Sequence, residues 1–292
     1  MPGERSNAFG MDRRVVREEM PIEAKHTQMT PESSIVLRGK QIGYRIRNRI
    51  RLPLPMFRVW HHGESQFECP ICDYRGPFAR LRSFGGVREH AVCPKCRSFE
   101  RHRLQYLVMR DSLKCLNGRS VRMLHFAPEE FLRQIFSRRF TNYETADISM
   151  DNVDHKVDIQ ELPFASGSYD LVFASHVLEH VRDDRRAIKE VRRILRVGGV
   201  AVLPVPIVCD NTLEYPEANP FEAGHVRAPG PDYFEKYGEY FGKVEVYNSA
   251  SFPEEFQTYV YEDRTKWPTP ECPLRQPMQG ARHMDFVPVC HV

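Results

Sequence analysis

From about residue 120 onward, short apolar runs alternate with segments whose apolar residues recur at helical spacing. The run DLVFAS (170–175) is apolar almost throughout, and the segment 180–196 carries an apolar stripe before Gly198 and Gly199 end it. Strands that are apolar on both faces and separated by helices form a parallel sheet that is covered on both sides. Further strands are expected at 121–126, at 143–147, in a short segment ending near Asp158, and at 200–206. The pattern predicts an α/β fold.

The chain continues past the fifth strand with a predicted helix at 231–241, a strand at 243–249 and a closing strand at 285–292. The intervening stretch 250–284 is rich in proline and charge, which indicates an insertion. Ligands of parallel sheets bind beyond the carboxyl ends of the strands. The functional residues are therefore expected in the segments 125–130, 147–150, 158–160, 175–180 and 204–210.

Four cysteines form two C-x2-C pairs, CPIC and CPKC, with 20 residues between them: Cys69, Cys72, Cys93 and Cys96. This spacing is typical of a tetrathiolate zinc site, although four merely reduced thiols remain the alternative. Four protein ligands leave no position for water, so the ion would be structural. The segment after the second pair predicts a helix capped by Ser98. The other cysteines follow no pattern and are expected to be buried thiols: Cys115, Cys209, Cys272 and Cys290.

The 292 residues suffice for one large and one small domain, and 41% hydrophobic with 28% charged residues is typical of a soluble globular protein. No apolar run is long enough to span a membrane, and the first residues have no apolar signal region. We therefore expect a cytoplasmic protein. We divide it into a mobile tail with a basic connector (1–58), a zinc-ribbon-like module with its helix (59–112) and an α/β domain (113–292).

Charge is unevenly distributed between the two parts of the chain. Residues 1–110 hold 21 Lys and Arg against 11 Asp and Glu, and residues 111–292 hold the remaining 21 against 28, so the charges are about +10 and −7. The segment 36–58 carries seven basic residues and no acid. A role at nucleic acid or a membrane surface is conceivable for it, but we favour a basic connector lying on the acidic domain.

Several segments of the sequence are more specific than their spacing alone: CPIC, CPKCRSFERHR, MLHFAPE, TADIS, VDIQELPFASGSYDLVFASHVLEHVRDD, AIKEVRRILRVGGVAVLPVPI and GHVR. With these segments the chain resembles the class I S-adenosylmethionine-dependent methyltransferases, and more narrowly a bacterial branch with an N-terminal zinc-ribbon-like module. The resemblance covers about residues 65–248. It implies a Rossmann-like sheet of seven strands with a reversed final strand, preceded by a small zinc-binding module.

The segment matching the first motif of that superfamily departs from it, because Leu124 to Glu129 contains no glycine. The missing G-x-G-x-x-G also argues against a nicotinamide enzyme. The helix that begins at Pro128 still offers free N–H groups for the methionyl carboxylate of the cofactor. On this basis the cofactor contacts here would be His125, Phe126, Ala127 and Glu129. A hydrogen-bonded structural role for His125, and helix capping by Glu129, are the alternatives.

The resemblance assigns further cofactor contacts to the ends of the next strands. Asp147, followed by Ile148, would accept hydrogen bonds from the ribose hydroxyls, because two carboxylate oxygens suit two adjacent donors. Asp158 would accept from the adenine amino group, and Ile159 would pack on the ring. Both aspartates could instead be turn residues. Ser175 and His176 would complete the cofactor contacts.

In this superfamily, residues beyond the fourth strand face the acceptor, and the loop after the fifth strand, which here holds His225 and Arg227, commonly covers the acceptor pocket. We assign acceptor and catalytic roles to His176, His180, His225 and Arg227. For a hydroxyl acceptor a histidine would be the base, whereas Arg227 would clamp a carboxylate acceptor that needs no base. Helix packing and surface ion pairs are the alternatives for His180 and Arg227.

The expected function is transfer of a methyl group from S-adenosylmethionine to a small, anionic metabolite, through oxygen. An RNA- or protein-modifying methyltransferase, and a binding protein without catalysis, are the rival interpretations. The expected cofactors are S-adenosylmethionine and a structural Zn²⁺. The expected partner is a small-molecule acceptor, without nucleic acid or a membrane span, and a homodimer is left open.

Overall fold

The computed structural model describes residues 67–83, 85–113, 120–270 and 272–292. The expectations for the tail and connector (1–58), the basic segment 36–58 and Cys115 lie outside these residues. The chain divides into units Met1–Trp60 and His61–Val292, and all described residues belong to the second. No helix among them is long and apolar enough to cross a membrane.

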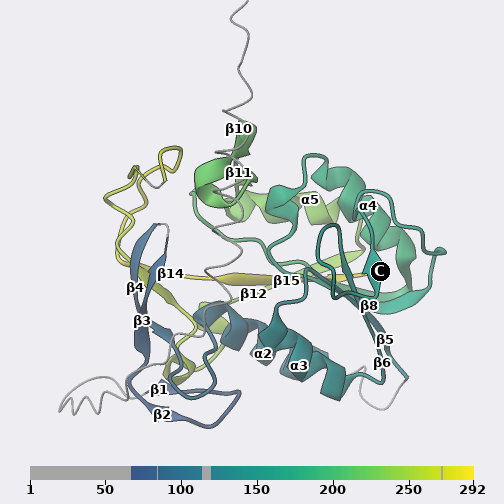
Figure 1. Cartoon of the computed structure of the whole chain (residues 1–292), viewed down its shortest axis with the longest axis horizontal. Helices are drawn as coiled ribbons and strands as arrows, with labels where there is room; N and C mark the ends of the chain where they lie inside the picture. Colours follow the sequence, from purple (N-terminus) through teal and green to yellow (C-terminus); the bar gives the residue numbers. More distant parts are fainter. Residues whose placement is uncertain (1–66, 84, 114–119, 271) are drawn as a thin grey trace, which may run out of the picture. The chain divides into compact units, whose positions relative to one another are not determined.

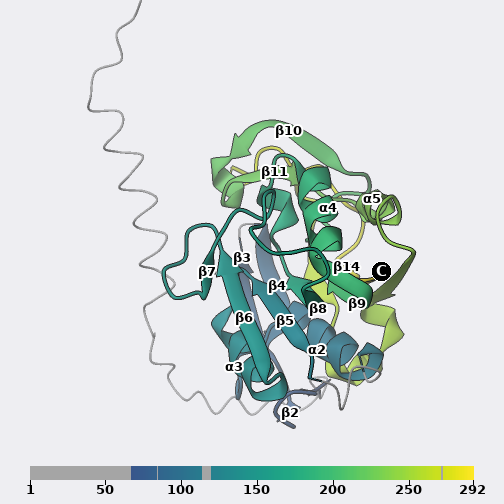
Figure 2. The same cartoon turned by 90° about the vertical axis from the view of Figure 1, so that its right-hand side faces the viewer.

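A seven-stranded sheet forms the centre of the structure, in the order β12-β15-β9-β8-β5-β6-β7. Its parallel strands are β5 (Arg122–Phe126), β6 (Asn142–Asp147), β7 (His155–Lys156), β8 (Tyr169–Ala174) and β9 (Leu195–Val202). Figure 2 shows β6, β5, β8 and β9 side by side. The predicted closing hairpin is β12 (Lys243–Asn248) and β15 (Phe286–His291), and β15 is antiparallel to both neighbours. The reversed final strand of the Rossmann-like methyltransferase fold is therefore confirmed.

Successive residues of the sheet point to opposite layers of helices. Met123, with Leu171 and Val200, packs with α2 (Glu100–Ser112) and α3 (Glu130–Arg139), whereas Leu124, with Val172 and Ala201, packs with the opposite layer. That layer consists of α4 (Asp184–Ile194), η4 (Pro231–Phe234) and α5 (Glu235–Gly238). Figure 1 shows α2 and α3 on one side of the sheet and α4 and α5 on the other. Burial on both faces explains why the central strands are continuously apolar.

A second sheet joins segments that are far apart in the sequence. Its order is β14 (Arg282–His283), β13 (Val260–Glu262), β4 (Gly86–Val92) and β3 (Ala79–Ser83). Strand β13 of the predicted insertion pairs with β4, with Tyr261 opposite Glu89. Trp267 Nε1 also donates to the Gly85 carbonyl at 2.9 Å. The insertion thus completes the sheet of the cysteine-containing module.

Arg103 of α2 ties the two parts of this arrangement together. Its side chain is fully buried and donates to the carbonyl oxygens of Ser98, Ala91 and Gln257, at 2.6–3.1 Å. Carbonyl oxygens compensate the buried guanidinium, which would otherwise be costly to desolvate. One arginine therefore links the cysteine module, α2 and the insertion.

The remaining elements are short. Strands β1 (Phe67–Glu68) and β2 (Arg75–Gly76) form a hairpin, and β10 (Leu213–Asn219) pairs with β11 (His225–Ala228). Single 3-10 turns are η2 (Leu178–His180), η3 (Pro220–Glu222), η5 (Ser249–Ser251) and η6 (Glu254–Phe256).

Three boundary predictions were wrong. The helix expected at 180–196 is interrupted, because Asp183 caps a new helix by accepting from the Arg186 N–H. The glycines at 198 and 199 do not end that helix but lie in β9, where the pairing with β8 shifts and Gly198 takes φ +76°. Phe99 rather than Ser98 occupies the N-cap of α2, because the Ser98 hydroxyl lies 3.2 Å from the sulfur of Cys96.

Candidate active site

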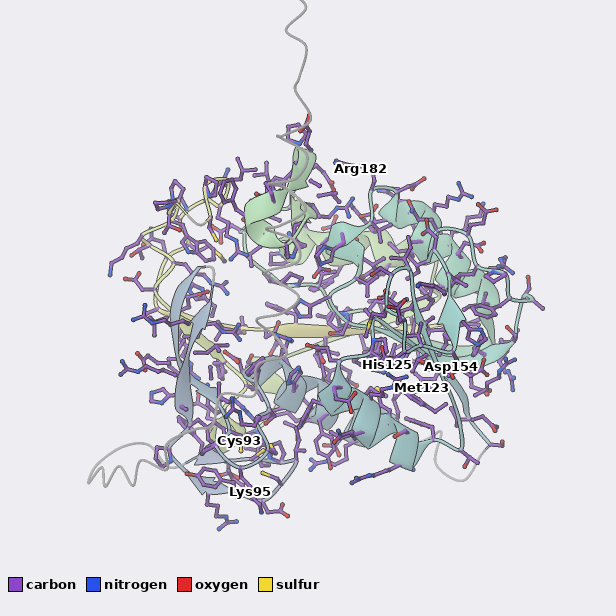
Figure 3. The ribbon with its side chains drawn as sticks, in the orientation of Figure 1. Cys93, Lys95, Met123, His125, Asp154 and Arg182 are labelled. Atoms are coloured by element: carbon purple, nitrogen blue, oxygen red, sulfur yellow. The ribbon has the colours of Figure 1, made fainter. Side chains whose placement is uncertain are left out.

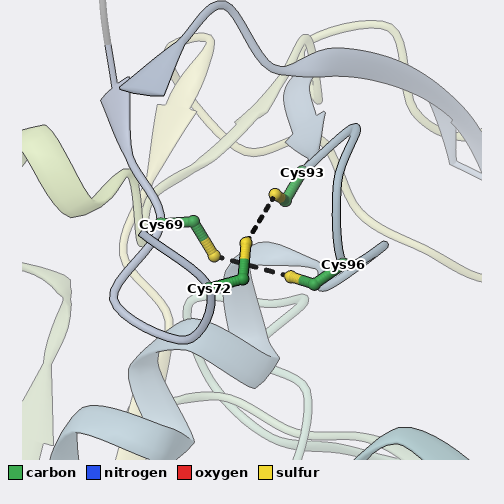
Figure 4. Close-up of side chains that lie close together, drawn as sticks. All are labelled: Cys69, Cys72, Cys93 and Cys96. Atoms are coloured by element: carbon green, nitrogen blue, oxygen red, sulfur yellow. Dashed lines mark hydrogen bonds between the residues drawn. The ribbon is translucent and has the colours of Figure 1, made fainter. Parts of the chain in front are cut away.

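The four paired cysteines converge on one point (Figure 4), and all four Sγ atoms lie within 4.8 Å of one another. Cys69 and Cys96 sulfurs are 3.5 Å apart, and those of Cys72 and Cys93 are 3.6 Å apart. Four thiolates at about 2.3 Å from a zinc ion would stand roughly 3.8 Å apart. Cys69, Cys72, Cys93 and Cys96 form no disulfide. The donor set and its spacing fit a closed tetrahedral site.

Each C-x2-C pair owes its shape to a tight turn. The Asp73 N–H donates to the Cys69 carbonyl and the Arg97 N–H donates to the Cys93 carbonyl, both at 2.9 Å. Asp73 and Arg97 both take positive φ, 57° and 68°. The two turns therefore repeat one geometry, and each brings its pair of sulfurs to the same side.

The carboxyl edge of the large sheet brings the predicted cofactor segments together. Phe126 is in register with Ala146 and with Ala174, so the loops after β5, β6 and β8 begin at the same edge. Ala127 follows Phe126, which is buried, and its N–H donates to the Ala146 carbonyl at 2.9 Å. Ala127 has φ 45°, in the region that favours glycine. The chain thus makes the turn of the first motif with the smallest chiral residue.

Glu129, at the N-cap of α3, contacts α2 rather than its own helix. Its carboxylate pairs with Arg101 and lies 3.1 Å from Nε2 of His102. No side-chain capping bond forms, so the alternative role as a cap is wrong. Burial alone would raise the pKa of Glu129, but Arg101 and His102 outweigh it and hold that pKa well below its usual range. Glu129 is an ionised group that joins α2 to the first motif.

His125 is a structural residue. Its side chain is 1% exposed, Nδ1 lies 2.8 Å from the Tyr143 hydroxyl, and its ring contacts Phe136 and Phe173. Figure 3 labels it with Met123, which points into the same layer. Burial lowers the pKa of His125 to about 3, so the ring is neutral. The assignment of this side chain as a cofactor contact is corrected, because the core encloses it.

The two strand-end aspartates occupy the predicted positions and also stabilise turns. Asp147 Oδ1 accepts from the N–H groups of Ser149 and Met150, both at 2.7 Å. Asp158 accepts from the backbone and side-chain amides of Gln160 at 2.8–3.1 Å. Their neighbours differ, since Ile148 is exposed and Ile159 is buried in the apolar core. The turns fix both carboxylates at the sheet edge.

Two predicted residues at the end of β8 contact different parts of the molecule. The Ser175 hydroxyl accepts from Nε2 of Gln105 at 2.9 Å, so α2 also reaches this strand end. His176 has φ 55°, and its N–H donates to the Pro204 carbonyl. Its Nδ1 lies 3.3 Å from Oε1 of Glu179, and its ring is partly exposed. His176 thus stands at the edge of β8 and β9 with a carboxylate behind it.

His180 and His225 come together from separate elements. Their rings lie edge to face with centroids 4.6 Å apart, at the end of η2 and the start of β11. Burial lowers the pKa of His225 to about 4, whereas His180 is exposed. Glu179 between His176 and His180 is fully buried. Burial opposes its ionisation, but the surrounding histidines, led by His176, lower its pKa.

Arg227 cannot act as the predicted substrate clamp. It is 1% exposed, and Nη1 and Nη2 donate to the backbone carbonyls of Leu178, Val181 and Arg182. Its Nε donates to Glu214 at 3.0 Å. The carboxylate-clamp assignment is corrected, because these partners occupy the guanidinium on every side. Arg227 instead fixes the loop that carries Glu179 and His180.

Sequence reasoning missed the contribution of α2 to this edge. Arg101, His102 and Gln105 contact Glu129 and Ser175, as described above. They lie in or next to the ERHR word that follows the second cysteine pair. A charged cluster on the first turns of a helix was the available signal, but only the packing of α2 shows which loops it meets.

A comparison with protein families points to the same kind of fold as the strand order of the large sheet. Residues 118–203 match a family described as a methyltransferase domain. An uncharacterized 37.1 kDa protein in transposon TN4556 of Streptomyces fradiae is 42% identical over 60 residues, or 20% of this chain and 17% of that protein. An uncharacterized methyltransferase of Mycobacterium sp. (strain KMS) is 52% identical over 42 residues, or 14% and 17% of the two chains. The chain thus spans about a sixth of the length of these relatives.

Among solved structures, an S-adenosylmethionine-dependent methyltransferase from Mesorhizobium loti has a TM-score of 0.41 and 15% identity. The alignment covers 65% of this chain and 100% of that one. Residues 118–203 thus match a methyltransferase domain, and the strand order, with its reversed seventh strand, is that of the Rossmann-like methyltransferase fold.

Proposed function

We propose that the protein transfers a methyl group from S-adenosylmethionine to an oxygen of a small acceptor at the carboxyl edge of the large sheet. The observation that carries the proposal is the register of β5, β6 and β8. This register places the Ala127 turn, Asp147 and Ser175 at adjacent strand ends. Ligands of open parallel sheets bind at this edge.

The residues at this edge fit the parts of the cofactor. Asp147 would hold the ribose hydroxyls, with Oδ1 fixed by its turn, and Asp158 with Ile159 would hold the adenine. The first N–H groups of α3 would meet the carboxylate of the methionyl part. The cofactor supplies an electrophilic methyl group on a sulfonium.

The acceptor side is formed by His176, with Glu179 behind it. A hydroxyl oxygen forms the new bond to the methyl carbon while the carbon–sulfur bond breaks, and the hydroxyl proton must leave. His176 is the partly exposed group beside this edge, and Glu179 at 3.3 Å would stabilise the imidazolium that receives the proton. The loss of the Arg227 clamp removes the main reason for an anionic acceptor, so we favour a hydroxyl.

We also propose that Cys69, Cys72, Cys93 and Cys96 hold a structural zinc ion, as their spacing supports. It would fix the module that positions α2.

Calorimetry with S-adenosylhomocysteine tests the cofactor assignment directly. The full chain should bind it at one site, and the His176→Ala variant should bind it with similar affinity but lose methyl transfer to hydroxyl acceptors. Absence of binding by the parent protein would favour the rival interpretation, a binding protein without catalysis. Salt-dependent binding of RNA would favour the other rival.

A further inference from the structure

Three side chains, two from the turn after β8 and one from the start of β11, form a compact group, of which the proposed methyl transfer uses only Glu179, as the partner of His176. We call Glu179, His180 and His225 the Glu–His–His cluster. One ligand atom from each lies within 4.8 Å of the other two. Glu179 and His180 come from η2, and His225 begins β11. Arg227 lies in β11, as His225 does, and donates to the carbonyls of Leu178 and Val181 in and after η2. It therefore holds the two segments of the cluster together.

Glu179 is the observation that points to a ligand. Its side chain is 0% exposed; Oε1 has the His176 imidazole at 3.3 Å as its contact, and Oε2 has no hydrogen-bond partner among the described residues. A buried carboxylate is costly unless it is paired or coordinates a metal, and an unsatisfied one in a native structure calls for a missing partner. The nearest cation-forming groups are imidazoles, which are themselves metal ligands.

A second buried carboxylate lies close to the ring of His225. The ring Nδ1 lies 3.6 Å from Oε2 of Glu222, which is 2% exposed. At this distance the two atoms form no hydrogen bond, and neither has a hydrogen-bond partner among the described residues. Glu222 is in turn held by Arg275 and the Tyr215 hydroxyl. His180, by contrast, is exposed, so the cluster opens to solvent on that side.

From this geometry we propose that the Glu–His–His cluster binds a divalent cation of the first transition row. Two imidazoles and one carboxylate suit such ions, and three protein ligands leave open positions for other oxygens. The tetrathiolate site is closed, whereas this one is open. If the proposed function holds, the cation would coordinate the acceptor hydroxyl next to His176. This role rests on the proposed function. The acceptor would then be a hydroxyl compound with a neighbouring oxygen that chelates the ion.

Cobalt is the probe for this site. The full chain, carrying its own zinc, is dialysed against Co²⁺, and both metals are measured by elemental analysis. We expect about one cobalt per chain without loss of zinc, because Co²⁺ accepts nitrogen and oxygen ligands. Glu179→Gln and His180→Ala should each weaken cobalt binding by at least about tenfold, since even outer partners of metal ligands cost 10- to 100-fold.

Glu245→Gln is the matched control, because Glu245 pairs with Lys243 and His291 away from the cluster, and it should bind cobalt like the parent. His180 is exposed, so its replacement decides the matter even if Glu179→Gln fails to fold. Cobalt uptake only in exchange for zinc, or unchanged affinity in His180→Ala, would overturn the proposal. Calorimetry with S-adenosylhomocysteine on the same samples reports separately on the proposed function.

Discussion

At the scale of single residues, Asp147 is the most direct test of the cofactor pose. Asp147→Ala should weaken S-adenosylhomocysteine binding roughly ten- to a hundredfold, because a charged acceptor of hydrogen bonds is worth about 1.5–3 kcal/mol. Asp147→Asn, which keeps one acceptor oxygen for the turn at Ser149, should lose less. Calorimetry measures both. Equal affinity in the parent and the alanine variant would show that the ribose lies elsewhere.

The buried contacts of Arg227 predict an effect on the stability of the protein. Arg227→Met should destabilise the protein by roughly 3 kcal/mol or more, because three backbone carbonyls each lose a buried donor at about 1–3 kcal/mol, whereas half-exposed Glu214 keeps Lys236. Urea unfolding measures the change. Arg186→Met is the matched control, since Arg186 pairs with Glu161 on the surface and should cost no more than about 1 kcal/mol. Similar losses in both variants would contradict the anchoring role.

At the scale of elements, the cysteine module depends on a distant segment, since Tyr261 of β13 pairs with Glu89 of β4. Cys93→Ser should abolish zinc binding, about one ion per chain in the parent, and increase amide exchange in β13 as well as β4, because these strands pair. Elemental analysis and hydrogen exchange measure the two effects. Cys209→Ala, which removes a buried thiol outside the module, should retain the metal. Exchange confined to β4 would show that β13 is stable by itself.

Helix α2 shows how much an element's function depends on its neighbours. Its sequence indicates a helix, but only the fold shows that its side chains contact both sheets and the first motif. Leu104 and Val108 enter the core of the large sheet, and Arg101 pairs with Glu129. The packing of α2 therefore links the cysteine-containing module to the carboxyl edge of the large sheet.

At the scale of the whole molecule, buried histidines make stability depend on pH. The folded protein keeps His125 neutral, with its pKa lowered to about 3, and burial also lowers the pKa of His102 and brings that of His225 to about 4. An unfolded histidine binds a proton below about pH 6.5. Between these values the unfolded state holds more protons, so stability is complete above pH 6.5 and falls as the pH is lowered.

His125→Phe should remove one part of this dependence. Below about pH 6, each such histidine lowers the free energy of unfolding by roughly 1.4 kcal/mol for every pH unit of acidification. Phenylalanine keeps the ring among Phe136 and Phe173 but has no proton to bind. Urea unfolding at pH 7.5, 6 and 5 should therefore show a shallower loss for the variant than for the parent. Parallel pH profiles would mean that His125 titrates normally in the folded state.

The local pattern of the sequence determined the α/β class, the strands of the large sheet and the cysteine pairs. Apolar runs such as 170–175 have few alternatives to a buried strand, and two C-x2-C turns are local geometry. The same holds for the strand-end position of Asp147, because the end of a strand is a local property.

Only the tertiary structure decided which side chains are free. Arg227 and His125 had the right residue type for a site, yet long-range contacts with Leu178 and Tyr143 occupy them. Conversely, the pairing of β13 with β4 and the approach of His225 to Glu179 join residues that the sequence separates by 46 positions or more. Burial and hydrogen-bond partners come from the whole fold, so residue type and spacing can nominate such groups but cannot assign them.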